Sequence, residues 1–267
     1  MSLERLFASA EPLDTDAHRI LACSDRYAAP TPERVLPDGA VHLIFNLGDR
    51  QAGERGAELM CLAMGATCEP TRLVLSGAVE QLCVRLRVGA AAAILGVPAG
   101  ELTDQGVALD ALWGAAAAEA LERLHAAPRG AARVALLARL LRDRLHQAAP
   151  LSSAALAAVR RIAGSGGRIR VRDLAAELGL GDRRLQQLFR EHVGLSPKAM
   201  CRLARFRGVL ARCRSAKRSW VEVALDGGFY DQAHLVNELR AFTGLSPSEL
   251  AQRGDFGFFQ EDCSAPG

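Results

Sequence analysis

The second half of this 267-residue chain contains an internal repeat, which limits the possible folds more than any other feature. Residues 171–197 read VRDLAAELGLGDRRLQQLFREHVGLSP, and residues 221–247 read VEVALDGGFYDQAHLVNELRAFTGLSP. The beginnings of the two copies align at an offset of 49 residues and their ends, after a one-residue insertion, at an offset of 50. A repeated unit of this length indicates a supersecondary motif, so the two copies are expected to fold alike.

Each copy has the pattern of two short helices joined by a tight turn. A small residue inside the first helix, Ala175 or Ala224, lets the second helix cross closely. The turn needs a positive φ, which Gly179 and Gly228 can adopt. The Ala-x-x-x-Gly spacing alone would also suit a plain helical hairpin. Two matched copies favour a pair of helix-turn-helix units.

Polar residues indicate where the helices of the repeat begin. Asp182 and Asp231 are placed to cap the second helix of each copy. Ser196 and Ser246, each followed by a proline, are placed to cap the helix that comes next.

Residues 197–213 predict one helix between the two copies. About 17 residues make a helix of about 25 Å, and successive major-groove faces on one side of B-DNA lie about 34 Å apart. Such a helix can hold two reading helices in adjacent grooves. Some of its arginines are expected to contact phosphates and others only to face water: Arg202, Arg205, Arg207, Arg212 and Arg214.

The two halves of the chain differ in charge. Residues 1–150 carry 15 basic and 18 acidic residues, a net charge of −3, and residues 165–253 carry 16 basic and 9 acidic residues, a net charge of +7. A basic half suits a polyanion, although a solvated arginine-rich surface gives the same count. With the repeat, this charge favours double-stranded DNA as partner. It also divides the chain into domains at 1–150 and 151–253 and a loose tail at 254–267.

The first half predicts an antiparallel β-domain up to about residue 88 and helices from about residue 90. Strands are expected at 41–47, 58–64, 71–76 and 81–88, and helices at 109–125 and 131–146. The fold class is therefore α+β, with an all-α second domain. The helices can serve either as a dimer interface or as a cover over the sheet through one apolar set: Leu112, Leu121, Leu124, Val134, Leu137 and Leu141.

Two polar strand faces in the first half are candidates for a ligand site. His42 and Asn46 share one face, and Arg85 and Arg87 share a face of another strand. If the faces converge inside a barrel, these four residues can bind a polar or anionic ligand. The alternative, which we expect, is a face open to water, as antiparallel sheets often have.

No constellation of residues predicts catalysis or a bound metal. Cys61 and Cys68 lack the paired short spacing of a zinc site. The Gly-Ser-Gly-Gly run at 164–167 fits neither a nucleophile elbow nor a phosphate loop and predicts a linker. No paired carboxylates or Cys–His arrangement stands out. We therefore expect a protein that is not an enzyme and has no cofactor.

Composition points to a cytoplasmic protein without a membrane contact. No apolar run reaches the roughly 18 residues of a membrane span, and the first 25 residues lack the pattern of a signal peptide. Seven cysteines, an odd number without regular spacing, argue against a disulfide framework.

Residues from about 168 to 252 resemble the DNA-binding domain of AraC-type (AraC/XylS) regulators, two helix-turn-helix units joined by a long helix. The resemblance rests on LAAELG at 174–179, LQQLFR at 185–190, VA at 223–224, GFYDQAHL at 228–235 and GLSP at 244–247. The first half resembles the amino-terminal domain of a poorly characterised branch of these regulators, through RVLPDG at 34–39, LIFNL at 43–47, VRLRV at 84–88, LGVP at 95–98, ELTD at 101–104 and LDALWG at 109–114. It implies a cupin-like β-fold but no particular ligand.

The resemblance also implies which side chains of the first recognition helix face DNA. It places Arg183, Gln186 and Gln187 toward the bases, while Arg184 and Arg190 are expected to contact phosphate. Arginine can pair with guanine and glutamine with adenine, each for about 1–3 kcal/mol of discrimination. The alternative for Arg183 is a solvated arginine at a helix start.

The second recognition helix is chemically weaker. The equivalent positions hold Ala233, Val236 and Asn237, of which alanine and valine can contact only a thymine methyl group. Asn237 also departs from the basic residue common in the family. Gln232 and His234 match common polar positions, and His234 is expected to pack or to contact phosphate. Base discrimination should therefore reside mainly in the first unit.

The sequence thus predicts a sequence-specific transcriptional regulator that reads two adjacent major-groove segments. The resemblance implies three further partners: RNA polymerase, a small-molecule effector and a second copy of the chain. Two alternatives stay open. One is a ligand-free architectural DNA-binding protein, and the other is an enzyme-like small-molecule domain fused to a DNA-binding module.

Overall fold

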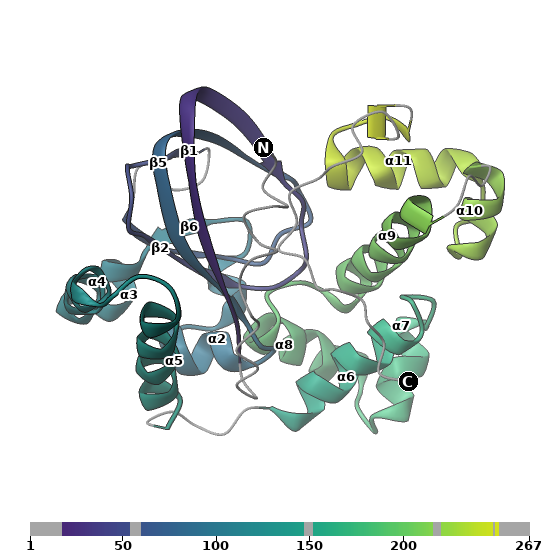
Figure 1. Ribbon diagram of the computed structural model, residues 1–267. Helices are drawn as coiled ribbons and strands as arrows, with labels where there is room; N and C mark the ends of the chain where they lie inside the picture. Colours follow the sequence, from purple (N-terminus) through teal and green to yellow (C-terminus); the bar gives the residue numbers. More distant parts are fainter. Residues whose placement is uncertain (1–17, 54–59, 147–151, 216–219, 248, 251–267) are drawn as a thin grey trace.

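The computed structural model of the chain has a β-sheet with helices in its first half and only helices in its second (Figure 1). It describes residues 18–53, 60–146, 152–215, 220–247 and 249–250. The predicted domain boundary at 150/151, the tail at 254–267 and most of the segment tested for a signal peptide lie outside these residues. The α+β class and the all-α second half are confirmed. Within the described ranges, no helix has the length and apolarity that crossing a membrane requires.

The first half is built on one antiparallel sheet with the strand order β1-β5-β2-β4-β6, with β3 also paired to β5. The figure shows that β1 and β5 are long and strongly bent, so that the sheet curls over itself (Figure 1). The strands are β1 (His18–Val35), β2 (His42–Asn46), β3 (Ala52–Gly53), β4 (Cys61–Met64), β5 (Thr71–Leu86) and β6 (Gly106–Ala108).

Two strand predictions were wrong. The strands expected at 71–76 and 81–88 are one strand, β5, which continues through Gly77 at φ +63°. The sequence analysis did not predict β1, because Pro30 and Pro32 argue against a strand interior. These prolines lie at the edge of the sheet, where the β1–β5 register shifts between Tyr27 and Thr31. The first residues of the strand predicted at 58–64 lie outside the described residues, and the rest contains β4.

Helices pack on one side of this sheet: α2 (Ala90–Leu95), the short 3₁₀ helix η1 (Ala99–Leu102), α3 (Leu109–Trp113), α4 (Ala115–Ala126) and α5 (Ala131–His146). The single helix predicted at 109–125 is broken at Gly114, whose φ of +59° and ψ of −140° end α3. Leu124, Val134, Leu137 and Leu141 are buried in the core of the chain. This burial favours the alternative in which these helices cover the sheet.

The second half contains α6 (Ser153–Gly164), α7 (Val171–Glu177), α8 (Asp182–His192), α9 (Pro197–Ser215), α10 (Trp220–Asp226) and α11 (Gln232–Thr243). The pairs α7/α8 and α10/α11 are the two predicted helix-turn-helix units. The connecting helix α9 has 19 residues, or about 28 Å at 1.5 Å per residue. The Gly-Ser-Gly-Gly run is not a linker, because a Cβ at Gly167 would lie 2.1 Å from the Cys201 carbonyl oxygen of α9. It is a turn packed inside the helical half.

The turn residues of the repeat behave as predicted, with one exception among the caps. Gly179 and Gly228 take φ values of +64° and +75°. Asp231 accepts a hydrogen bond from the His234 N–H at 2.7 Å. Asp182, by contrast, is the first residue of α8, whose N-cap is the preceding glycine. Its carboxylate therefore lies beside the positive end of the helix dipole instead of capping it.

Ser196 and Ser246 cap as predicted. Their hydroxyl groups accept hydrogen bonds from the backbone N–H groups of Ala199 at 3.1 Å and Glu249 at 3.3 Å.

A continuous hydrophobic core joins the two halves. Gly39, in the loop after β1, has a φ of +73° and lies against α9, where an added Cβ would meet Leu203 Cδ2 at 2.6 Å. The Thr103 hydroxyl donates to the Gly194 carbonyl at 2.5 Å. Arg34 Nη1 donates to the Thr243 carbonyl at 2.5 Å. Both helix-turn-helix units are therefore docked on the first half.

Candidate functional site

The recognition helix of the first unit, α8, separates an apolar face from a polar one. Leu185, Leu188 and Phe189 are buried beneath it, because their spacing places them on one side of a helix of 3.6 residues per turn. All five residues predicted to face DNA in this unit are exposed: Arg183, Arg184, Gln186, Gln187 and Arg190.

Two of these five residues already have neighbours within the chain. The Gln187 amide donates to Glu191 Oε1 at 2.8 Å, one turn along the helix. Arg190 lies where α8 meets η1, since a Cβ at Gly100 would come within 2.7 Å of Arg190 Cγ. Arg183 and Arg184 are exposed in the first turn of α8, at the other end of the helix from Arg190. The start of α8 is thus the freer end.

The recognition helix of the second unit, α11, exposes fewer of its predicted DNA-contacting side chains than α8 does. Gln232, Ala233 and Asn237 are exposed, whereas His234 and Val236 are half-buried. His234 Nδ1 accepts a hydrogen bond from the Tyr230 backbone N–H at 3.3 Å, and its ring meets that of Phe229 edge-on at 5.4 Å between centroids. His234 therefore packs within the turn.

Tyr230 is a candidate DNA contact that the sequence reasoning missed. Its side chain is 89% exposed in the turn before α11. An aromatic residue inside the turn of a helix-turn-helix unit was the available signal. An exposed phenol there can stack or donate a hydrogen bond at a DNA surface.

Arginines of α9 hold the helical half together. Arg202 Nε donates to both carboxylate oxygens of Glu238, at 3.0 and 2.9 Å, and its guanidinium lies 5.4 Å from the centre of the Phe242 ring. Arg205 Nη1 donates to the Gly167 carbonyl at 2.8 Å. These two side chains position α11 and the end of α6, so the prediction of phosphate contacts along α9 loses two of its candidates. The side chains of Arg212 and Arg214 lie outside the described residues.

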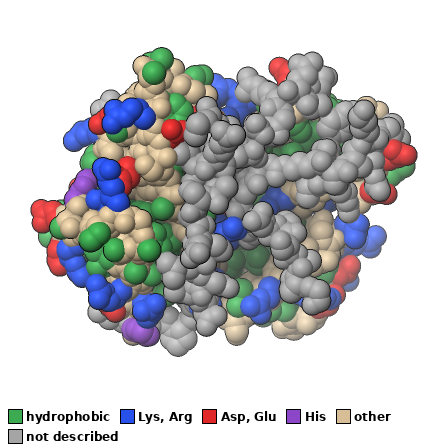
Figure 2. Space-filling view, viewed as in Figure 1, with side chains coloured by type: hydrophobic (Ala, Val, Ile, Leu, Met, Phe, Trp, Pro, Cys, Tyr) green, Lys and Arg blue, Asp and Glu red, His purple; other side chains and the backbone are tan. Residues whose placement is uncertain are grey.

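Basic side chains are spread over the face of the molecule seen in Figure 2. They form separate groups, with acidic and apolar side chains between them (Figure 2). The exposed polar residues of α8 and α11 define the candidate DNA surface.

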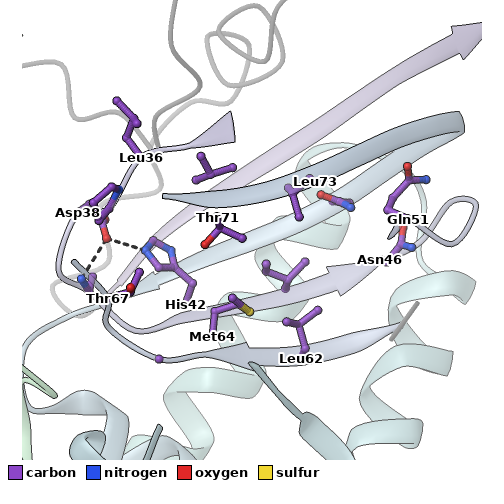
Figure 3. Close-up of a pocket in the computed structure, with 16 residues that line it drawn as sticks. Leu36, Asp38, His42, Asn46, Gln51, Leu62, Met64, Thr67, Thr71 and Leu73 are labelled. Atoms are coloured by element: carbon purple, nitrogen blue, oxygen red, sulfur yellow. Dashed lines mark hydrogen bonds and ion pairs between the residues drawn. The ribbon is translucent and has the colours of Figure 1, made fainter. Parts of the chain in front are cut away.

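A second candidate site is a cavity of about 100 Å³ inside the curled sheet of the first half (Figure 3). His42, Asp38 and Thr67 lie at one end, and Asn46 and Gln51 lie at the other (Figure 3). Met64 and other apolar side chains line the space between them. The lining residues are Val35, Leu36, Pro37, Asp38, Ala40, His42, Ile44, Asn46, Gln51, Leu62, Met64, Gly65, Thr67, Thr71, Leu73 and Gln81.

A buried cluster of charged and polar groups closes one end of the cavity. Asp38 Oδ1 accepts hydrogen bonds from His42 Nε2 at 2.9 Å and from the Ala40 N–H at 3.0 Å. Asp38 Oδ2 accepts one from Arg85 Nε at 2.7 Å. Burial opposes ionisation of Asp38, but the nearby His42 and Arg85 and these hydrogen bonds outweigh it, so the pKa of this carboxyl lies well below its usual value.

The expectation of a water-facing strand surface was wrong. His42 and Asn46 are 5% and 2% exposed, because β2 pairs with β5 so that His42 lies opposite Arg85 and Asn46 opposite Gln81. Both residues line the cavity. Arg85 and Arg87 instead line a smaller space of about 30 Å³ between the two halves. The structure thus separates the four predicted ligand residues into two places.

The sequence reasoning also missed cavity residues. Asp38 was named only within the motif RVLPDG at 34–39, and Gln81 only as the start of a predicted strand. Met64 ends β4, Thr67 lies between β4 and β5, and Thr71 begins β5, and the fold of the sheet brings them to the same space.

Cys61 and Cys68 are half-buried free thiols. Burial, reinforced by Asp110, raises the pKa of Cys61 to about 12, and burial raises the pKa of Cys68 to about 11.

Two family models match the chain. Residues 174–253 match a helix-turn-helix domain, and residues 14–108 match a domain of unknown function (DUF6597). No curated protein matches the chain.

Several solved structures are similar at low identity. ToxT from Vibrio cholerae is 9% identical, covering 88% of this chain and 98% of ToxT with a TM-score of 0.47. A structure of ToxT with a bound unsaturated fatty acid is 8% identical, with coverages of 88% and 95% and a TM-score of 0.44. A transcriptional regulator with an AraC-type DNA-binding domain from Chromobacterium violaceum is 21% identical, with coverages of 37% and 88% and a TM-score of 0.35.

The helix-turn-helix match falls on the two repeated units, their connecting helix and their exposed recognition faces. The second half is therefore a DNA-binding domain of the AraC type. The chain as a whole is a DNA-binding transcriptional regulator whose first half contains the β-sheet and matches the domain of unknown function.

Proposed function

We propose that this regulator reads two adjacent major-groove segments of double-stranded DNA, with α8 in one groove and α11 in the next. The observation that carries the proposal is the pair of exposed recognition faces held by a single helix of about 28 Å. That length is close to the 34 Å between successive grooves on one side of B-DNA, and the tilt and width of the two units can supply the difference.

The predicted contacts divide between bases and phosphates. Arg183, Gln186 and Gln187 on α8 read bases, and Arg184 and Arg190 contact phosphates. On α11, Ala233, Val236 and Asn237 face the bases. Gln232 and His234 support the backbone contacts, with His234 acting mainly through its packing in the turn.

We further propose that a small molecule in the cavity of the first half modulates DNA binding. The loops that line the cavity also dock the DNA-binding half. Asp38 lines the cavity and its neighbour Gly39 lies on α9. Val35 lines the cavity and its neighbour Arg34 holds the end of α11. A ligand that moves this loop changes the docking of both units, which is a coupling between two sites.

The remaining assignments follow from this role. The regulatory domain spans residues 1–150 and the DNA-binding domain residues 151–253, followed by the tail at 254–267. The protein acts in the cytoplasm, where its DNA is, without catalysing a reaction. RNA polymerase and a second copy of the chain are its proposed protein partners. A dimer would use surfaces other than the apolar stripes of α4 and α5, which are buried within the chain.

The test is selection from a randomised duplex library with the full chain, followed by measurement of affinity for the selected site across a salt series. The expected result is a site in two parts, with specific binding at least about 10³-fold tighter than non-specific binding. Weak, steeply salt-dependent binding without a selected sequence would contradict the proposal and favour the alternative of an architectural DNA-binding protein. Changes in affinity for the selected site on adding a cavity ligand test the modulation separately.

A further inference from the structure

The cavity of the first half has the chemistry of a site for an uncharged ligand. Of its sixteen lining residues, all within the described part of the chain, only Asp38 and His42 carry titratable side chains. These two groups bond to each other at the end of the cavity. The wall between the two ends is mainly aliphatic, with Leu36, Ile44 and Leu73 among its members.

The charge at the closed end is balanced within the protein. Asp38 bonds with His42 and Arg85 at 2.9 and 2.7 Å, and the side chains of Asp38 and His42 are 8% and 7% exposed. A ligand carboxylate in the cavity would come close to this buried carboxylate, and like charges in a dry site repel strongly. A ligand ammonium would have to be desolvated without a carboxylate left over to pair with it.

The opposite end of the cavity holds three amide side chains, two of which are hydrogen-bonded within the chain. The Asn46 amide donates to the Asp49 carbonyl at 2.8 Å. The Gln51 amide bonds to the backbone of Ser76 at 2.8 and 3.1 Å. These two side chains are engaged in holding their loop. Gln81, opposite Asn46 in the sheet, makes no hydrogen bond through its amide to any described residue, and its amide is therefore available to a ligand.

The size of the cavity limits the ligand as well. A volume of about 100 Å³ is smaller than the roughly 150 Å³ of an apolar protein cavity that binds benzene. The cavity therefore encloses a ligand group of about six non-hydrogen atoms or fewer. The apolar body of the ligand gains from leaving water, and one polar group satisfies Gln81.

We propose that the cavity binds an uncharged, mainly apolar molecule, with a hydroxyl, carbonyl or amide group that bonds to Gln81. This proposal rests on the proposed function, because it gives the chemical class of the effector. It differs from the polar or anionic ligand expected from the sequence, because Arg85 and Arg87 do not line this cavity.

Three probes with the same chain and different head groups test it. Binding of 1-octanol, octanoate and octylammonium to the full chain is measured by titration calorimetry at pH 7. We expect 1-octanol to bind at least about tenfold more tightly than either ion, since burial of an unpaired charge costs several kcal/mol. Tighter binding of octanoate or octylammonium overturns the proposal, as does an absence of 1-octanol binding.

Variants locate the bound probe. Ile44→Trp fills the cavity and should weaken 1-octanol binding at least about tenfold. Gln81→Leu keeps an apolar wall and removes the polar group, and should weaken binding about three- to tenfold. Val74→Trp is the control for Ile44→Trp, because Val74 is 39% exposed, does not line the cavity and lies on β5, the strand that carries Gln81. Equal binding by all four proteins means adsorption elsewhere and contradicts the proposal. If Ile44→Trp fails to fold, Gln81→Leu gives the same decision.

DNA affinity of the same preparations separates the two proposals. If the protein binds its selected DNA site but not 1-octanol, the proposed function stands and the uncharged ligand is excluded. If the protein binds 1-octanol in the cavity but selects no DNA sequence, the ligand proposal stands and sequence-specific DNA binding is excluded.

Discussion

The two helix-turn-helix units share one backbone plan and differ in what surrounds it. The first recognition helix, α8, packs against α2, α6, α7, α9 and η1, so it lies in the shared core of both halves. The second, α11, packs mainly against α9 and α10 and is held by Arg202 and by Arg34.

Their outward faces differ in the opposite sense. The first exposes arginine and glutamine side chains that can pair with base edges, while the second exposes Ala233 and Asn237 with a half-buried Val236. The firmly packed unit thus exposes the side chains that we propose to read bases, and the lightly packed unit is the one whose position we propose that the first half adjusts.

The largest expected effect is on stability. Leu185→Ala and Leu235→Ala remove equivalent side chains that are both fully buried, and each should lower the free energy of unfolding by about 2–5 kcal/mol. We expect Leu185→Ala to destabilise the whole chain and Leu235→Ala to increase amide hydrogen exchange mainly in α10 and α11. Denaturant unfolding and hydrogen exchange measure this. Equal hydrogen exchange in both units of both variants would contradict the inferred difference in packing.

The next effect is on DNA recognition. Arg183→Ala should lower the affinity for the selected site by about 1–3 kcal/mol and relax selection at one base pair. Its counterpart, Ala233→Arg, adds a cation to the weaker unit and should raise affinity at low salt. Binding titrations with base changes in each half-site check the comparison. Larger losses from changes in the second half-site would contradict the dominance of the first unit.

A smaller effect should distinguish how the two units are docked. Arg34→Ala removes the hydrogen bond to the end of α11, and Thr103→Val removes the one to the loop after α8. Each should cost about 0.5–1.5 kcal/mol. We expect faster hydrogen exchange in α11 for the first variant and near the end of α8 for the second. Exchange that rises in both units with either variant would mean that they undock together.

The smallest effect concerns the helix caps. Asp231→Ala removes a capping acceptor and should cost about 1 kcal/mol. Asp182→Ala removes only a charge near the start of α8 and should cost about 0.3–1 kcal/mol at low salt. Thermal unfolding at low and high salt measures both, because salt screens the charge effect that both carboxylates share and leaves the capping hydrogen bond of Asp231. A larger cost for Asp182→Ala would mean that it caps α8 in solution.

Local features of the sequence predicted the helical half well. The turn glycines, the caps at Asp231 and Ser196 and the buried leucines of each unit depend on residues within a few positions of one another. The one failed cap, Asp182, missed by a single position, because Gly181 can take the N-cap place without a side-chain acceptor.

Prediction was poorer in the first half, where partners are distant in the chain. β1 pairs with β5 across 36 to 68 positions, from Val35↔Thr71 to His18↔Leu86, and no local pattern reveals a strand that contains two prolines. The pairing of β2 with β5 is also distant in the chain, and it helps to decide whether His42 and Asn46 face water or a cavity. Alternation along β2 gave the correct pair of residues but could not tell which side of the sheet was enclosed.

The sequence by itself determined the two helix-turn-helix units and their outward chemistry, because helix periodicity, caps and positive-φ glycines act over a few residues. The tertiary structure alone decided the balance of charge around Asp38, the enclosure of the cavity and the seating of Gly39 and Arg34 on the DNA-binding half. Each of these depends on strand register and on packing between distant segments, which set what is buried and therefore which charges must be paired.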